Sequence, residues 1–322
     1  MIKKKYILIL LLLIGLFAIS SVSANDLNTN NNLTAIDDSS DLIATSDTDC
    51  DSVVSAGEKI IYFDAFASTN GDGSISKPYK YVNENTLNTD SGNDITAYFA
   101  EGVYELNTPF KISSDMVLVG ESRENTIFNS VLSDEYDFEI MQNSDLEIGY
   151  LTFNSINILN HGMLQAYEVT FENSESFEGD NAPSTYNTKN YNSSYGGVIN
   201  CDPIDDSYPY ISLENCIFEN NMAFCGGAIS LKNSILFAKE TSFDNAISYY
   251  HGGAIYALNS NLNISDSDFD TMVALYGGSI YCEASTLYLE NTNFHDTFSY
   301  SFGGALASKY SDININSCFF KE

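Results

Sequence analysis

The amino-acid sequence predicts an all-β fold, a parallel β-helix in which coils of about 25 residues stack on one another. Three observations lead to this prediction. Gly-Gly pairs recur at intervals of 25 to 30 residues, phenylalanines recur at steps of 25 or 26, and apolar residues at a spacing of two precede each phenylalanine. The pairs begin at Gly196, Gly226, Gly252, Gly277 and Gly303, and the phenylalanines are Phe218, Phe243, Phe269, Phe294 and Phe320.

Each glycine pair opens a strand. An aliphatic residue follows three positions after the first glycine, and a small or apolar residue follows two positions later, as in Ile255 and Ala257. A spacing of two places both side chains on one face of a strand, whereas a helix would repeat apolar residues at three and four. The other members of these columns are Ile199 and Cys201, Ile229 and Leu231, Ile280 and Cys282, and Leu306 and Ser308.

A second strand precedes each phenylalanine. Leu262 and Ile264 lie seven and five residues before Phe269, and the other units repeat this spacing. The step of five is odd, so the chain must bend if all three side chains point inward. The same pattern occurs before Phe153 and Phe171, so at least seven coils share one template. An antiparallel sandwich is the alternative, but its strands would not repeat in three aligned columns.

Polar residues after the phenylalanines fit the next bend. Asn220, Asn221 and Asn245 occupy these positions, and asparagine tolerates the left-handed backbone conformation of tight turns. Because the units stack, we also expect amide ladders between asparagines of neighbouring coils.

The N-terminal residues precede the repeats. Residues 1–24 are expected to be a secretory signal, because lysines precede an apolar run that ends in small residues at Ala24. A retained membrane anchor is the alternative. Residues 25–58 are rich in Asn, Asp, Ser and Thr and are expected to be a flexible polar lead.

The β-helix is predicted over residues 59–322. Residues 59–110 would form an N-terminal cap and the first coils, with a short helix over residues 79–89. The sequence ends just after the last repeated phenylalanine without a capping segment, so we expect the C-terminus to be incomplete.

Two loops are predicted to leave the stack. Phe171 and Phe218 are 47 residues apart, nearly two coils, and the polar stretch 176–195 lies between them. It is predicted to protrude as a loop. A second loop is predicted over residues 201–210.

Charge limits the partners. The chain carries 44 acidic and 13 basic residues, a formal net charge of −31. Nucleic acid is disfavoured as a partner because its binding requires a basic surface, and anionic polysaccharides would be repelled for the same reason.

Six cysteines raise the question of disulfides. Cys201 and Cys282 would lie three coils apart in one column, and Cys216 and Cys318 four coils apart in another. Both separations exceed the roughly 7 Å limit between Cα atoms of a disulfide. A bridge between Cys216 and Cys225 stays possible, and buried free thiols are favoured.

No catalytic, metal or cofactor site is predicted. His161, His251 and His295 fall at unrelated positions of the repeat and are expected to be solvated turn residues. Arg123 is the only arginine, and adjacent aspartates lack a basic partner nearby in sequence. Asp72, or Asp202 with Asp205 and Asp206, offers oxygen ligands for calcium, but the spacing fits no standard calcium loop. The protein is therefore predicted not to be an enzyme.

One longitudinal edge is predicted to be aromatic. Stacking would align the residues that precede the glycine pairs, and aromatic rings there offer surfaces for sugars or a protein partner. The alternative is that the rings fold under the bend and cover the core. The candidate ligand-contact residues are Tyr195, Tyr249, Tyr250, Tyr276 and Tyr300.

The repeats resemble known families. The segment FENNMAFCGGAI, residues 218–229, resembles the polymorphic outer membrane protein repeat, which pairs FxxN with GGA[ILV]. The opening YFDAFASTNGDGSISKPYKYV resembles the start of pectin-lyase-like β-helices. The whole resembles adhesin-like surface proteins of methanogenic archaea. The resemblance implies a right-handed parallel β-helix at the cell exterior that binds extracellular glycans or surface proteins of other cells. A polysaccharide lyase or glycoside hydrolase, and a structural spacer of the cell envelope, are the alternatives.

Overall fold

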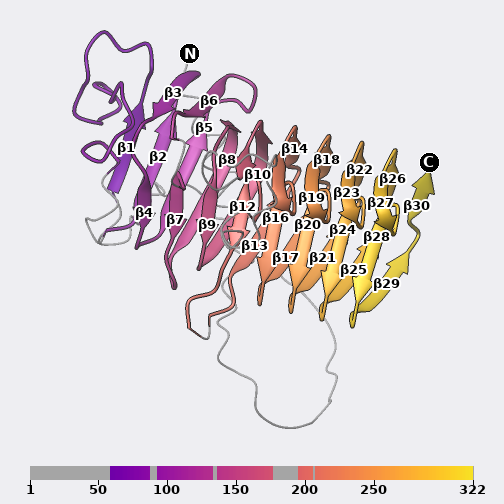
Figure 1. Ribbon diagram of the computed structural model, residues 1–322. Coiled ribbons are helices and arrows are strands. Elements are labelled where there is room, and N and C mark those ends of the chain that lie inside the picture. Colours follow the sequence, from indigo (N-terminus) through magenta and orange to yellow (C-terminus); the bar gives the residue numbers. More distant parts are fainter. Residues whose placement is uncertain (1–58, 88–92, 133–135, 177–194, 206, 322) are drawn as a thin grey trace, which may run out of the picture. The chain divides into compact units, whose positions relative to one another are not determined.

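The protein is a parallel β-helix. The computed structural model describes residues 59–87, 93–132, 136–176, 195–205 and 207–321, all within one compact unit. Over these residues the chain forms strands joined by bends, no helix occurs, and every pairing between named strands is parallel. The strands form sheets of 17, eight and five strands that stack coil upon coil (Figure 1).

The largest sheet contains two ladders that share the long strands β8 (Asp145–Asn154) and β10 (Met163–Glu172). The first ladder adds β1 (Lys59–Phe63), β2 (Ile95–Phe99), β5 (Met116–Gly120), β13 (Tyr210–Glu214), β17 (Ile235–Lys239), β21 (Asn261–Ser265), β25 (Thr286–Glu290) and β29 (Asp312–Asn316). The second, called here the phenylalanine ladder, adds β3 (Gly102–Leu106), β6 (Thr126–Ser130), β14 (Ile217–Glu219), β18 (Ser242–Asp244), β22 (Asp268–Asp270), β26 (Asn293–His295) and β30 (Phe319–Lys321).

Two smaller sheets lie beside the largest one, and the five-stranded sheet is present only from β11 (Glu175–Ser176) onward. The eight-stranded sheet contains β4 (Phe110–Ile112), β7 (Phe138–Ile140), β9 (Ile158–Asn160), β12 (Ile199–Cys201), β16 (Ile229–Lys232), β20 (Ile255–Leu258), β24 (Ile280–Glu283) and β28 (Leu306–Lys309). The five-stranded sheet contains β11, β15 (Met222–Cys225), β19 (Ile247–His251), β23 (Val273–Tyr276) and β27 (Phe298–Phe302).

Left-handed residues make the corners of a coil. In the coil that begins with β17, Glu240 has φ 51° before β18 and Asn245 has φ 49° before β19. Gly252, with φ 60°, precedes β20 and begins the Gly-Gly corner. The bend predicted between the apolar pair and the phenylalanine is thus confirmed.

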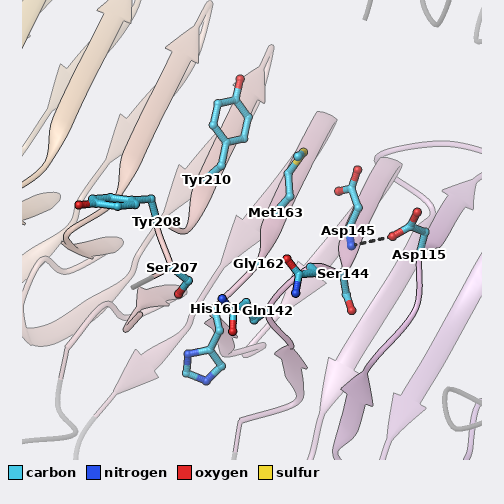
Figure 2. A pocket seen from close by; sticks show the side chains of 11 residues that line it. Asp115, Gln142, Ser144, Asp145, His161, Gly162, Met163, Ser207, Tyr208 and Tyr210 are labelled. Carbon is cyan, nitrogen blue, oxygen red and sulfur yellow. Dashed lines mark hydrogen bonds between the residues drawn. The ribbon is translucent and has the colours of Figure 1, made fainter. Parts of the chain in front are cut away.

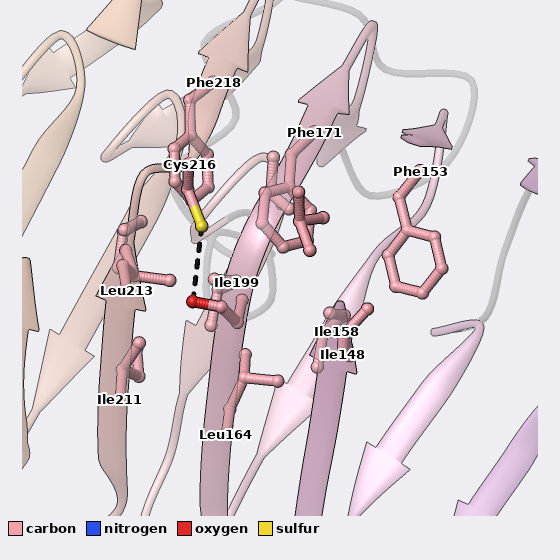
Figure 3. Close-up of a cluster of buried hydrophobic side chains, with 14 of the residues drawn as sticks. Ile148, Phe153, Ile158, Leu164, Phe171, Ile199, Ile211, Leu213, Cys216 and Phe218 are labelled. Atoms are coloured by element: carbon pink, nitrogen blue, oxygen red, sulfur yellow. Dashed lines mark hydrogen bonds between the residues drawn. The ribbon is translucent and has the colours of Figure 1, made fainter. Parts of the chain in front are cut away.

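A single column of stacked rings lies on the inward face of the phenylalanine ladder. Phe218, Phe243, Phe269 and Phe294 are fully buried, and successive ring centroids lie 4.9, 4.6 and 4.9 Å apart with nearly parallel planes. Figure 3 shows the same column nearer the N-terminus, at Phe153. Ile148 and Leu164 of the first ladder point into the same packed interior. The aligned interior predicted from the repeat is confirmed.

Polar ladders run beside this apolar column. The Nδ2 of Asn245 donates to Oδ1 of Asn220 at 2.7 Å, as the expected amide ladders require. Buried serines in another corner satisfy backbone groups of the neighbouring coil. Ser234, Ser260 and Ser285 each donate their Oγ–H to the carbonyl two residues back. The Oγ of Ser260 accepts the backbone N–H of Ser234, and the Oγ of Ser285 accepts that of Ser260.

Some expectations are corrected. The helix expected over residues 79–89 is not formed at residues 79–87, which make bends and turns held by Thr86, whose backbone N–H donates to the carbonyl of Asn83 at 3.0 Å. The predicted signal, polar lead and nearly all of the loop over 176–195 lie outside the described residues. No described helix is long and apolar enough to cross a membrane.

The described cysteines are free thiols. Cys201, Cys216, Cys225 and Cys282 are buried, and burial raises the pKa of each of these thiols to about 12. Cys201 and Cys282 share one inward column through Leu231 and Ala257, so the expected three-coil separation is found. These side chains therefore behave as small apolar residues.

Candidate functional site

A pocket of about 420 Å³ opens on the outer face of the first ladder, where β8, β10 and β13 meet the loop over residues 202–209 (Figure 2). Its wall includes Asp115, Asp145, His161, Tyr208 and Tyr210. Inward and outward side chains alternate along β8, so Leu146 and Ile148 enter the core while Asp145 and Glu147 face outward.

Only one of the two carboxylate oxygens of Asp145 has a hydrogen-bond partner among the described residues. Its Oδ2 accepts a hydrogen bond of 2.8 Å from Nε2 of Gln165, and its backbone N–H donates to Oδ1 of Asp115. Its Oδ1 is buried and has no hydrogen-bond partner among the described residues. A buried acceptor without a donor costs free energy, so the ionised form of Asp145 is destabilised there.

Two neighbouring carboxyls keep their protons to unusually high pH. Burial, with a smaller contribution from Asp115, raises the pKa of Asp145 to about 6. Burial and the charge of Asp145 raise the pKa of Glu147 to about 7. Asp145 lines the pocket, and Glu147 follows two residues later on the same face of β8, next to the lining. Perturbed carboxyls at such a place are typical of functional sites.

The loop over 202–209 completes the pocket. His161 is 7% exposed, and its Nδ1 donates to the backbone carbonyl of Asp202, which ties the loop to the turn before β10. The backbone N–H of Ser207 donates to the carbonyl of Ile204 in a short turn. Tyr208 follows this turn, is 70% exposed and lies at the rim of the pocket. The loop predicted over 201–210 is present, whereas His161 is buried and not the solvated turn residue expected.

The predicted aromatic edge follows the five-stranded sheet. Cys225, His251, Tyr276 and Phe302 are register partners on successive strands, as expected. Among the candidate residues, Tyr250 contacts Tyr276 at 5.4 Å between ring centroids. The others lie along the same edge but pack elsewhere: Tyr195 against Tyr256, and Tyr300 against Phe298, while Tyr249 adjoins Tyr250 in β19. Their role in ligand contact stays a prediction.

A histidine lies within this aromatic cluster. The ring of His251 stacks on Tyr281 at 4.0 Å and on Tyr256 at 5.5 Å between centroids. Burial lowers the pKa of His251 to about 4, so it is neutral at physiological pH. A second pocket of about 340 Å³ adjoins the cluster, and its one cation, Lys232, pairs with Asp202 at 2.8 Å.

The carboxyl pair is not among the residues predicted from the sequence. Asp145 and Glu147 are not adjacent but are separated by one inward-facing residue, and that alternation in the strand was the available indication. Burial of the two carboxyls depends on packing of neighbouring coils and has no local sequence pattern. Among the described residues, no group of three histidine, cysteine or acidic side chains is arranged to hold a metal ion.

No protein-family model matches the chain, and no curated protein matches it. A solved structure, that of the PL6 family alginate lyase AlyGC, aligns with 82% of this chain at 8% identity and a TM-score of 0.37. The chain spans 40% of that protein's length. The resemblance to archaeal adhesin-like proteins and their repeat type finds no support in these comparisons and stays a prediction.

The prediction that the chain is not an enzyme is corrected. The finding that stands against it is the solved structure reported above, which is that of a polysaccharide lyase. The low TM-score identifies neither the reaction nor the substrate. The adhesin role is likewise without support, and the pocket described above is the basis for assigning a function.

Proposed function

We propose that the protein is an exported carbohydrate-active enzyme that hydrolyses a glycan in the pocket beside β8. The observation that carries the proposal is the outward-facing carboxyl pair Asp145 and Glu147, with pKa values of about 6 and about 7. Export is supported by the signal-like composition of residues 1–24. The exposed ring of Tyr208 offers a surface on which a sugar ring can stack.

The two carboxyls suit complementary roles. Near pH 6.5 Glu147 is mostly protonated and donates its proton to the glycosidic oxygen as the bond to the anomeric carbon breaks. Asp145 is mostly ionised and accepts a proton from the water that forms the new bond. Side chains two residues apart leave a strand about 6.7 Å apart, which is in the range of inverting glycosidases.

The pH dependence follows from these assignments. Below about pH 6 Asp145 takes up a proton and is lost as base, and above about pH 7 Glu147 loses the proton that it must donate. The rate is therefore expected to peak between these values. The measurement is the pH profile of kcat/KM.

The direct test is an assay of new reducing ends with a panel of polysaccharides. Asp145→Asn and Glu147→Gln should each lower kcat at least about 100-fold, the usual loss for general acid or base groups. Asp312→Asn is the matched control, because Asp312 occupies the same outward column six coils away and is exposed. Full activity in the two site variants, or no cleavage of any polysaccharide, would contradict the proposal. Unsaturated product ends would contradict the hydrolytic mechanism.

A further inference from the structure

We infer that the pocket beside β8 takes an uncharged glycan and rejects polymers that carry carboxylate or sulfate groups. The inference rests on the proposed function and specifies its substrate class. It is carried by the charges that line the pocket, by the pairing of the nearest cations and by the hydrogen-bonding capacity of Asp145.

Among the residues that the structure describes, the pocket wall supplies no permanent positive charge. Figure 2 shows its 11 lining residues, of which Asp115 and Asp145 are acidic and His161 is the one basic side chain. His161 is already directed toward the loop, with Nδ1 on the carbonyl of Asp202 and Nε2 3.6 Å from a carboxylate oxygen of Glu139. No lysine or arginine is among the lining residues, so an anionic sugar would find no bidentate or point-charge partner.

Three described cations of neighbouring coils are engaged elsewhere. Lys111 pairs with Glu139 at 3.4 Å on the eight-stranded sheet. The Nη1 of Arg123 donates to the carbonyl of Asn215 at 3.0 Å. Lys232 pairs with Asp202 in the second pocket. Moving any of these side chains to the first pocket would break an existing ion pair or hydrogen bond.

The carboxylate of Asp145 favours a ligand that can donate. An ionised carboxylate has about four acceptor sites, so Oδ2, which already accepts from Gln165, can take a further hydrogen bond from a sugar hydroxyl. A carboxylate or sulfate group is an acceptor only and would meet a second acceptor there. When Asp145 and Glu147 are ionised, they repel an anionic group of the ligand. In this partly buried setting the repulsion is stronger than it would be in bulk water.

The test compares binding of defined hexasaccharides by isothermal titration calorimetry at pH 8. The probes are neutral gluco-, manno-, xylo- and galacto-hexasaccharides and anionic hexamers of galacturonate and mannuronate. The best neutral probe is expected to bind at least about tenfold more tightly than either uronate probe. The double variant Asp145→Asn/Glu147→Gln should reduce that ratio about tenfold, because the amides keep the shape and can donate hydrogen bonds. Asp312→Asn should leave the ratio unchanged.

Lowering the pH gives a second measurement. As the pH falls from 8 to 5, the ratio of the affinities of the unsubstituted protein for the neutral and the uronate probes should decrease, because Asp145 and Glu147 both take up protons. Asp115 and His161 also line the pocket, so a pH series alone does not separate their charges from those of Asp145 and Glu147. The isosteric double variant at pH 8 therefore decides which groups set the preference.

The outcomes separate the two claims. A uronate probe that binds as tightly as the best neutral probe, together with cleavage that depends on Asp145 and Glu147, overturns the inference and leaves the proposed function standing. An unchanged preference in the double variant also overturns it. Failure of every probe to bind and of every polysaccharide to be cleaved overturns the proposed function itself.

Discussion

At the scale of single residues, the fold depends on backbone conformations that most side chains avoid. The bends between strands place Asn215, Glu240, Asp266 and Asn291 at positive φ, and asparagine and aspartate accept this conformation most readily after glycine. Glutamate at one of these corners shows that stacking overrides local preference. Corners that use glycine or asparagine can therefore be predicted from the sequence. Corners at which neighbouring coils hold another residue type in the left-handed conformation cannot.

Gly252 offers a test of this backbone requirement. It has φ 60°, and a Cβ added to it would collide with the carbonyl oxygen of Ile255. Gly252→Ala should lower the free energy of unfolding by about 1–3 kcal/mol, the usual cost of a strained backbone residue. The measurement is urea unfolding followed by circular dichroism.

The control for that substitution is Gly149→Ala. Gly149 lies within β8, and the nearest atom to its added Cβ is a backbone oxygen at 3.6 Å, an ordinary contact. Its stability should change far less. Equal losses in the two variants would show that positive φ is not the source of the effect.

At the scale of elements, the columns of like side chains hold the coils together. Phe243 stacks between Phe218 and Phe269 with centroid separations of 4.9 and 4.6 Å, so its removal leaves a cavity between the rings of the two neighbouring coils. Phe243→Ala should cost about 3–5 kcal/mol, the range for deleting a buried aromatic side chain. Phe237, 43% exposed on the outer face of β17, gives a matched control whose replacement by alanine should cost much less. Similar losses at both positions, measured by denaturant unfolding, would mean that the column does not carry the stability.

The columns also explain which features the sequence could predict. Phe269, Ile264 and Ile255 recur at the coil period because every coil meets the same interior, so the repeat reveals the strands, the bends and the core. Asp145 and Glu147 occur once. Their burial depends on Gln165 one coil away and on a loop anchored through His161, and these contacts between distant residues leave no periodic trace.

The loop position was nonetheless foreseeable. The long interval between Phe171 and Phe218 marks the coil at which the repeat is interrupted, and the pocket opens at this coil. Interruptions of a regular stack are where side chains gain surroundings that the repeat does not supply. What the sequence left open was which face the residues after Cys201 would cover, since that depends on packing across coils.

At the scale of the whole molecule, stacking concentrates a strong negative charge. The formal net charge is −31, and parallel register aligns the outward carboxylates of Glu172, Glu219, Asp244 and Asp270 on successive coils. Neighbouring strands are about 4.8 Å apart, so this acidic column repels itself. Burial, and then the charge of the neighbours, raises the pKa of Glu172 and of Asp244, as expected of crowded carboxylates.

This repulsion should make stability depend on salt. Raising sodium chloride from about 0.02 to 0.5 M shortens the screening length from roughly 20 Å to below 5 Å, so Tm at pH 8 should rise by several degrees. Asp244→Asn removes a charge from the middle of the column and should raise Tm at low salt while weakening the response to salt. Asp312→Asn, outside the column, is the control for a general loss of charge. A Tm that stays constant or falls with salt would show that the coils tolerate their aligned charges without cost. The stability of the stack would then have to come from apolar packing and polar ladders strong enough to make that repulsion negligible.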